Sequence, residues 1–337
     1  MHHSKILSCR ISFVLSFLFF FTFSIPAFAE PSTKTIGISQ IVEHPALDAV
    51  RQSLIETLKT QGFEEGKNLN VIYENAQGNM VTSVQIANKL MSRNLDVAVG
   101  ISTPSAQTLY FEAQKHKKKI PIVFSAVSDP NAAQLESNTG YPITGITDTA
   151  NLEGLLELMH SLMPNLKKLG LMYNPSESNS ASTINRLKKL LDKQGIEYVE
   201  VTVTKTQEVA QATKSFIGKV DALYFPQDNT IVSAIQTVVN IASQSSPKLP
   251  IILPIFTSDP ILLKSGVLAA VGYDYEDVGS ETGMMVSEIL KGKDPKTLLV
   301  HSPKKLKAVV NADFAEKLGL TIPKKLEFSE IHTFSFK

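Results

Sequence analysis

Short apolar segments alternate with longer helical patterns along most of this chain, and this alternation restricts its fold more than any other feature. In the first half the apolar segments are predicted strands, at 35–39, 69–74, 96–101 and 120–127. The segments between them have helical periodicity, at 45–61, 79–93 and directly after Ile101. Repeated strand–helix pairs predict a parallel sheet with helices on both faces.

The same order starts again near residue 168. Predicted strands lie at 168–174, 197–203, 221–226, 249–256 and 266–274. Predicted helices lie at 180–194, 206–218, 230–245 and 280–291. A chain of 337 residues exceeds one typical domain, so the repetition predicts two similar α/β lobes.

The N-terminus has the pattern of a secretory signal peptide. Lys5 and Arg10 precede a continuous apolar run over 11–25, which is short for a membrane span. Ala27 and Ala29 follow at the positions that signal peptidase reads, so we expect residues 1–29 to be removed by cleavage after Ala29. This leader predicts a periplasmic protein.

The single cysteine, Cys9, lies in the leader before the apolar run, where it cannot serve as a lipid-attachment site. The mature chain therefore has no disulfide. Removal of Lys5 and Arg10 reduces the 33 basic residues to 31 against 32 acidic ones, which gives a formal net charge of −1. This balance gives no electrostatic case for a nucleic acid or an anionic membrane as partner.

Sequence motifs for catalysis and cofactor binding are absent. No dinucleotide fingerprint, phosphate loop or nucleophile elbow occurs. The five mature histidines lack the spacing of zinc ligands, at His44, His116, His160, His301 and His332. We therefore expect no enzyme activity, no cofactor and no metal.

Polar residues follow nearly every predicted strand, where open parallel sheets bind their ligands. In the first half these candidates are Ser39, Gln40, His44, Thr103, Ser105, Ser125 and Ser128. In the second half they are Tyr173, Asn174, Asp228, Asn229, Thr257, Ser258 and Asp274, with Gln227 and Asp259 beside them. Any one of them is explained by turn or cap chemistry, as for Asp228 before a predicted helix. Their recurrence in both halves favours a ligand site.

The join at 102–105, Ser-Thr-Pro-Ser, has two interpretations. Thr103 fits the N-cap of the following helix and Pro104 its first turn, which makes a well-capped helix. The alternative is a seat for an anion, because a helix N-terminus offers free N–H groups and hydroxyls flank them here.

Several blocks of the sequence resemble ABC-transporter substrate-binding proteins of the tryptophan/tyrosine-binding type. They include "STPSAQ", "PIVFSAVSDP", "YNPSESNS", "PQDNTI" and "SGVLAAVGYDYEDVGSETGMM", in the expected order over nearly the whole mature chain. The resemblance implies the type I periplasmic-binding fold, in which three crossover strands join two Rossmann-like lobes that close on a ligand. Lobe one would comprise 33–146 plus 275–303, and lobe two 147–274 plus 304–330. The crossovers would lie near "TGITD", "GYDYE" and "VHSPKK".

The resemblance also suggests roles for individual residues. Thr103, Pro104 and Ser105 would hold the α-carboxylate of an amino acid, by charge-assisted hydrogen bonds. Asp228 would hold the ammonium group, with Asp274 as the alternative. Phe256 and Tyr173 would contact an apolar ligand side chain.

The expected function is a periplasmic solute-binding component of an ABC importer, a monomer that binds an aromatic or other apolar amino acid and docks on membrane permease subunits. A sensing protein that presents the same ligand to a signalling receptor fits the sequence equally well. A secreted hydrolase or isomerase would need a nucleophile–base pair or a metal cluster, which the sequence lacks.

We predict that exported protein begins at Glu30 and carries no lipid. N-terminal sequencing and mass spectrometry of the exported chain measure this directly. An intact Met1 or an attached acyl chain would contradict the prediction.

Overall fold

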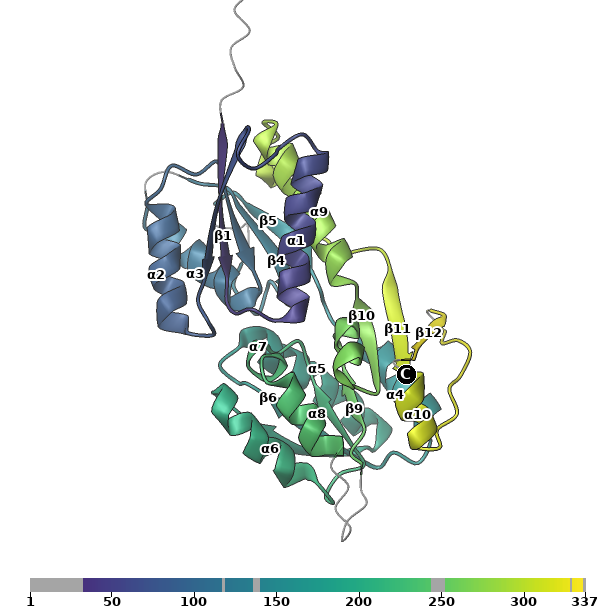
Figure 1. Cartoon of the computed structure of the whole chain (residues 1–337). Coiled ribbons are helices and arrows are strands. Elements are labelled where there is room, and N and C mark those ends of the chain that lie inside the picture. Colours follow the sequence, from purple (N-terminus) through teal and green to yellow (C-terminus); the bar gives the residue numbers. More distant parts are fainter. Residues whose placement is uncertain (1–32, 117–118, 136–139, 244–251, 328, 336–337) are drawn as a thin grey trace, which may run out of the picture. The chain divides into compact units, whose positions relative to one another are not determined.

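The computed structural model describes residues 33–335 except 117–118, 136–139, 244–251 and 328. The predicted leader lies outside the described residues. Two sheets, one of five strands and one of seven, carry the described part of the chain, which confirms the predicted α/β class with two mostly parallel sheets (Figure 1). Among the described residues no helix is long and apolar enough to cross a membrane.

The first sheet has the order β2-β1-β3-β4-β5, and all its pairs are parallel. Its strands are β1 (Lys34–Gln40), β2 (Leu69–Asn75), β3 (Val97–Ile101), β4 (Ile122–Val127) and β5 (Ile143–Thr147). One face carries α1 (Pro45–Thr60) and α9 (Tyr275–Leu290); the other carries α2 (Met80–Met91) and α3 (Thr103–Ala113) (Figure 1).

Two glycines allow α9 to lie close against α1. A Cβ atom on Gly279 would be 2.3 Å from the carbonyl oxygen of Val50, and one on Gly283 would be 2.7 Å from Cβ of Thr57. Any larger residue would have to push the helices apart. The long α1–α9 contact therefore depends on these two positions.

The second sheet has the order β12-β11-β10-β9-β8-β6-β7. Its strands are β6 (Lys168–Tyr173), β7 (Glu197–Thr202), β8 (Ala222–Phe225), β9 (Ile255–Thr257), β10 (Ala269–Tyr273), β11 (Leu306–Asn311) and β12 (Ile331–Phe334). The associated α-helices are α4 (Leu152–Leu162), α5 (Ser178–Gln194), α6 (Val209–Phe216), α7 (Asn229–Val232), α8 (Ile235–Ser243) and α10 (Ala312–Lys317). Short 3₁₀ helices occupy Thr206–Glu208 (η2), Pro260–Ser265 (η3) and Pro295–Thr297 (η4).

The structure corrects several predicted elements. The strand predicted at 249–256 is β9, which covers only Ile255–Thr257, and residues 249–251 lie outside the described part. The helix predicted at 230–245 is divided into α7 and α8, and the helix predicted at 206–218 begins as η2. Sequence analysis missed α4, β11, α10 and β12, and it located β5 only through the crossover that the resemblance implied near "TGITD". The second sheet is not wholly parallel, because β11 enters from the first sheet and pairs antiparallel with β10.

The described chain passes between the sheets in three segments, at 147–152, 273–275 and 298–306. Backbone hydrogen bonds join the first segment to the third: the Thr147 amide donates to the His301 carbonyl at 2.8 Å. The Thr147 and Ser302 hydroxyls also bond, at 2.6 Å. The predicted lobe boundaries fall near these segments and stay predictions.

A buried tyrosine joins the first crossing segment to the second. The Tyr275 hydroxyl lies 3.0 Å from Oδ2 of Asp148 and 2.5 Å from Oδ1 of Asp259, which precedes η3. Burial raises the pKa of Asp259 to about 7, with a smaller contribution from the charge of Asp148. Burial also raises the pKa of Asp148 above its usual value.

We expect Asp259→Asn to remove a pH dependence of stability. Between the unfolded pKa near 3.8 and the folded pKa near 7, the native carboxyl keeps a proton that the unfolded one has lost. Parent stability should therefore fall as pH rises across this window, by up to a few kcal/mol. Urea unfolding at pH 4.5, 6 and 7.5 measures the free energy of unfolding of parent and variant. The variant's value minus the parent's should grow with pH. A constant difference would show that Asp259 is ionised in the native protein.

Candidate functional site

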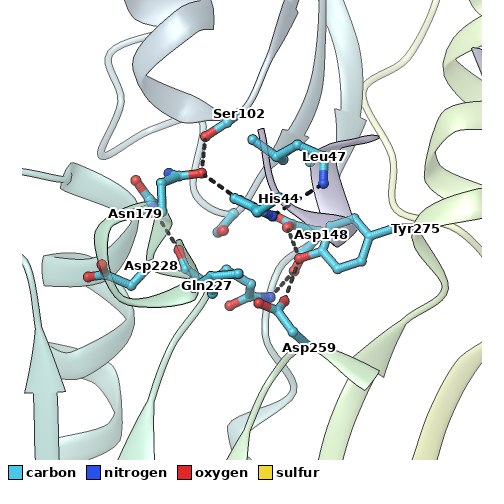
Figure 2. Close-up of a pocket in the computed structure, with 13 residues that line it drawn as sticks. His44, Leu47, Ser102, Asp148, Asn179, Gln227, Asp228, Asp259 and Tyr275 are labelled. Atoms are coloured by element: carbon cyan, nitrogen blue, oxygen red, sulfur yellow. Dashed lines mark hydrogen bonds between the residues drawn. The ribbon is translucent and has the colours of Figure 1, made fainter. Parts of the chain in front are cut away.

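A narrow pocket lies between residues of the two sheets (Figure 2). The first-sheet side contributes residues at or after the ends of β1, β3 and β4, namely His44, Leu47, Ser102, Ala126 and Ser128. The second-sheet side contributes residues that follow β6 and β8, namely Asn179, Gln227, Asp228, Asn229 and Val232. Asp148, Asp259 and Tyr275 complete the lining. The pocket therefore lies at the carboxyl ends of both sets of strands, where open α/β sheets bind ligands.

His44 connects the first sheet to the second. It is the N-cap of α1, and its Nδ1 atom accepts a long 3.5 Å bond from the Leu47 amide. Its Nε2 atom lies 3.4 Å from Oδ1 of Asn229, and the Ser102 hydroxyl donates to the same oxygen at 3.2 Å. Burial lowers the pKa of His44 to about 4, so the ring is neutral at pH 7 and Nε2 carries the hydrogen. Asn229 thus takes two bonds from across the pocket.

Glu177 and Asp228 hold the loop that begins α7. The Glu177 carboxylate accepts hydrogen bonds from the Asn229 side chain at 2.5 Å and from the Thr230 hydroxyl at 2.9 Å. Asp228 accepts from backbone amides with both oxygens, Oδ2 from Asn174 at 2.6 Å and Oδ1 from Ile231 at 3.0 Å. Burial, followed by the nearby charge of Glu177, raises the pKa of Asp228 to about 8. Asp228 is therefore an N-cap that tends to be neutral at pH 7.

Three acceptor oxygens in the pocket lining are buried without a hydrogen-bond partner among the described atoms: Oδ1 of Asp148, Oδ1 of Asn179 and Oε1 of Gln227. The side-chain amide nitrogens of Gln227 and Asn179, by contrast, each donate a hydrogen bond within the protein. Nε2 of Gln227 donates to the Asp148 carbonyl at 2.8 Å, and Nδ2 of Asn179 donates to the Gln227 carbonyl at 2.6 Å. Because amide nitrogens cannot accept, these bonds fix the amide oxygens as the unused ends.

Unpaired hydroxyls gather on the first-sheet side. Within the described structure, the buried hydroxyls of Ser39, Thr103 and Ser105 have no hydrogen-bond partner. The structure corrects the cap assignment here: Ser102 is the N-cap of α3, with φ 78° and no side-chain cap bond, and Thr103 is the first helical residue. Ser102 lines the pocket, and Thr103, Pro104 and Ser105 directly follow it in the first turn.

Of the sixteen residues selected from the sequence, the pocket lining contains His44, Ser128, Asp228 and Asn229. Four others are engaged in structural hydrogen bonds. Gln40 bonds to Asp48 and Arg51, Ser125 to Thr282, Asn174 to Thr230, and Ser258 to Tyr224. The Thr257 hydroxyl is buried and unpaired, but Thr257 does not line the pocket.

Three further selections lie away from the pocket. Phe256 is fully buried in the hydrophobic core beside the second sheet. The Tyr173 hydroxyl donates to Glu200 at 3.1 Å. Asp274 caps α9 and forms a 2.6 Å ion pair with Lys307. None of the three is placed for the ligand contact that the resemblance implied, because each side chain is occupied elsewhere.

Sequence analysis did not select Ser102, Asp148, Asn179, Gln227, Asp259 or Tyr275. Gln227 and Asp259 already stood at predicted strand ends. Asp148 follows β5, where the resemblance implied a crossover near "TGITD", but the residue itself was not selected. Asn179 and Tyr275 lie in the first turns of helices, which the strand-end rule does not cover. Groups of metal-ligating side chains are not found in the described part of the chain.

Comparison with known proteins finds substrate-binding proteins of ABC transporters and proteins similar to them. Residues 35–332 match the family model described as ABC transporter substrate binding protein. The chain is 37% identical over 290 residues to the tyrosine-binding protein of Clostridioides difficile (strain R20291). The aligned residues cover 85% of this chain and 81% of that protein.

Two solved structures are also similar. An ABC domain from Streptococcus pneumonia in complex with L-Trp has a TM-score of 0.80 at 32% identity, covering 90% of this chain and 100% of that one. A ligand-free, open substrate-binding protein from Clostridium difficile has a TM-score of 0.64 at 36% identity, covering 89% and 99%. With its two α/β sheets and the match over residues 35–332, this chain belongs to the ABC transporter substrate-binding proteins, a family of solute-binding proteins and not of enzymes.

Proposed function

We propose that this protein binds an aromatic or other apolar α-amino acid in the pocket and delivers it, in the periplasm, to the permease subunits of an ABC importer. One observation carries the choice of ligand. Buried hydroxyls without partners lie in the first turn of α3, directly after the lining residue Ser102, and buried acceptor oxygens without partners lie on Asp148, Asn179 and Gln227 in the lining. A zwitterion with a carboxylate and an ammonium group satisfies both sets, because buried polar groups are costly unless they are paired. The L-Trp of one relative and the name of another agree with this ligand class.

The carboxylate end belongs at the start of α3. The first-turn N–H groups of a helix have no acceptor within the helix and favour an anion. Here the unpaired hydroxyls of Thr103 and Ser105 lie in that first turn. Because α3 is eleven residues long, its dipole adds to the attraction.

The apolar part of the ligand would contact different residues from those expected. Phe256 and Tyr173 are occupied elsewhere, whereas Leu47, Ala126 and Val232 line the pocket. These side chains suit a hydrophobic group without offering further hydrogen bonds. We assign them the contact with the ligand side chain.

Ligand exchange requires the two sides of the pocket to separate. The cavity that the lining encloses measures about 10 Å³, far below the roughly 300–1,000 Å³ of common ligand pockets. Asn229 bonds to His44 and Ser102 across the pocket. The fold is also more similar to the L-Trp complex than to the open relative, although the open relative has the higher identity. We propose hinge motion at the three crossing segments.

Ser105→Ala should weaken the binding of L-tryptophan or L-tyrosine by about 1–3 kcal/mol, because one hydroxyl donor is lost while the backbone N–H groups remain. Isothermal titration calorimetry of the mature protein measures this. Ser92→Ala is the control, because Ser92 is exposed beyond the C-terminal end of α2, and its affinity should equal that of the parent. If the parent binds neither amino acid, the proposed ligand class is wrong; if Ser105→Ala binds like the parent, the carboxylate lies elsewhere.

A further inference from the structure

We infer that Asp148, with Asn179 and Gln227, forms the seat for the ligand's ammonium group, and this assignment rests on the proposed function. The sequence suggested Asp228 for this role, with Asp274 as the alternative. The assignment to Asp148 comes from the three unpaired acceptor oxygens that line the pocket on these side chains.

The number and kind of the unpaired atoms match a primary ammonium group. Such a group has three N–H donors and no acceptor, and the three side chains offer three acceptor oxygens. All three side chains are at least nine-tenths buried, so water cannot easily take the place of a ligand. A hydroxyl or a neutral amide would supply fewer donors and would leave at least one oxygen unpaired.

The three side chains are held in place by one another. Gln227 donates to the backbone of Asp148, and Asn179 donates to the backbone of Gln227 (Figure 2). These bonds use the donor end of each amide, so neither amide can rotate to present nitrogen to the pocket without losing a buried hydrogen bond. The seat is therefore preorganised for a cation and not for an anion.

Asp148 is also the carboxyl group that can present a negative charge there. The hydroxyl of Tyr275 has one hydrogen but contacts two carboxyl groups, so one of these must carry a proton. With the proton on Asp259, Asp259 donates to Tyr275 and Tyr275 donates to Oδ2 of Asp148. This chain leaves Asp148 ionised, with Oδ1 toward the pocket.

The other two candidates are less suited to an ammonium group. Both oxygens of Asp228 accept backbone amides at the start of α7, and the carboxylate of Glu177 is close enough to disfavour a second negative charge. Asp274 does not line the pocket and is paired with Lys307. Asp148 is the carboxyl group of the lining whose Oδ1 atom has no hydrogen-bond partner in the described structure. The Ser128 hydroxyl lies beside the same carboxyl and favours its charged form, because a hydrogen bond from it lowers the pKa of Asp148.

The test uses a ligand with and without its amino group. Parent, Asp148→Asn and Asp228→Asn are titrated by calorimetry with L-tryptophan and with indole-3-propionate, and the pair L-tyrosine and 3-(4-hydroxyphenyl)propionate repeats the comparison. Asp148→Asn should weaken amino-acid binding by about 30-fold or more, because it removes the charge that pairs with a buried ammonium. Its affinity for the propionate should stay within about threefold of the parent value, because that ligand never used the carboxylate.

Asp228→Asn is the matched control, since it makes the same chemical change in the same pocket. Its ratio of amino-acid to propionate affinity should equal that of the parent. Thermal unfolding confirms that each variant is folded. The assignment is overturned if Asp148→Asn keeps the parent ratio, or if Asp228→Asn is the variant that loses it. A parent that binds the propionates but no amino acid overturns the proposed function itself, and the assignment with it.

Discussion

The site depends on how polar side chains are paired where the carboxyl ends of two sheets meet. Burial there removes water, so each polar atom needs a partner within the protein or from a ligand. Glu177 satisfies the start of α7, His44 and Ser102 share an oxygen of Asn229, and Tyr275 bridges two carboxyl groups. The protein thus satisfies most of its own polar atoms. We propose that the few unpaired atoms of the lining are matched by the ligand.

This arrangement also bears on selectivity. A hydrophobic pocket separates similar ligands weakly, whereas buried polar groups reject a ligand that cannot pair with them. Asp148, Asn179 and Gln227 would each keep an unpaired oxygen beside a ligand that lacks an amino group. We expect the polar ends of the pocket to select the amino-acid backbone, while Leu47 and Val232 tolerate variation in the side chain.

The sequence predicted the fold well where apolar periodicity was strong, and poorly where elements were short. The helix expected at 45–61 is α1 at Pro45–Thr60, because five apolar positions mark one face of it. The short strand β5 gave no such signal, so only the resemblance placed a crossover there, and Asp148 at its end was not selected.

For the site, strand ends indicated the correct region but not the correct atoms. Asp228 was placed properly before a helix, yet its role as a cap and the unpaired oxygen of Asp148 depend on contacts between segments far apart in sequence. The distance between such segments cannot be obtained from local pattern.

The close packing of α9 has a mechanical consequence. Tyr275 at its first turn contacts both Asp148 and Asp259, while Gly279 and Gly283 press the same helix against α1. A helix of sixteen residues is about 24 Å long, so α9 extends about that far from its first residue, Tyr275, which lines the pocket. A rotation of ~5° about Tyr275 would displace the far end of the helix, near Leu290, by ~2 Å. Because α9 packs so closely against α1, such a rotation would have to carry α1 with it, and with α1 the His44 side of the pocket.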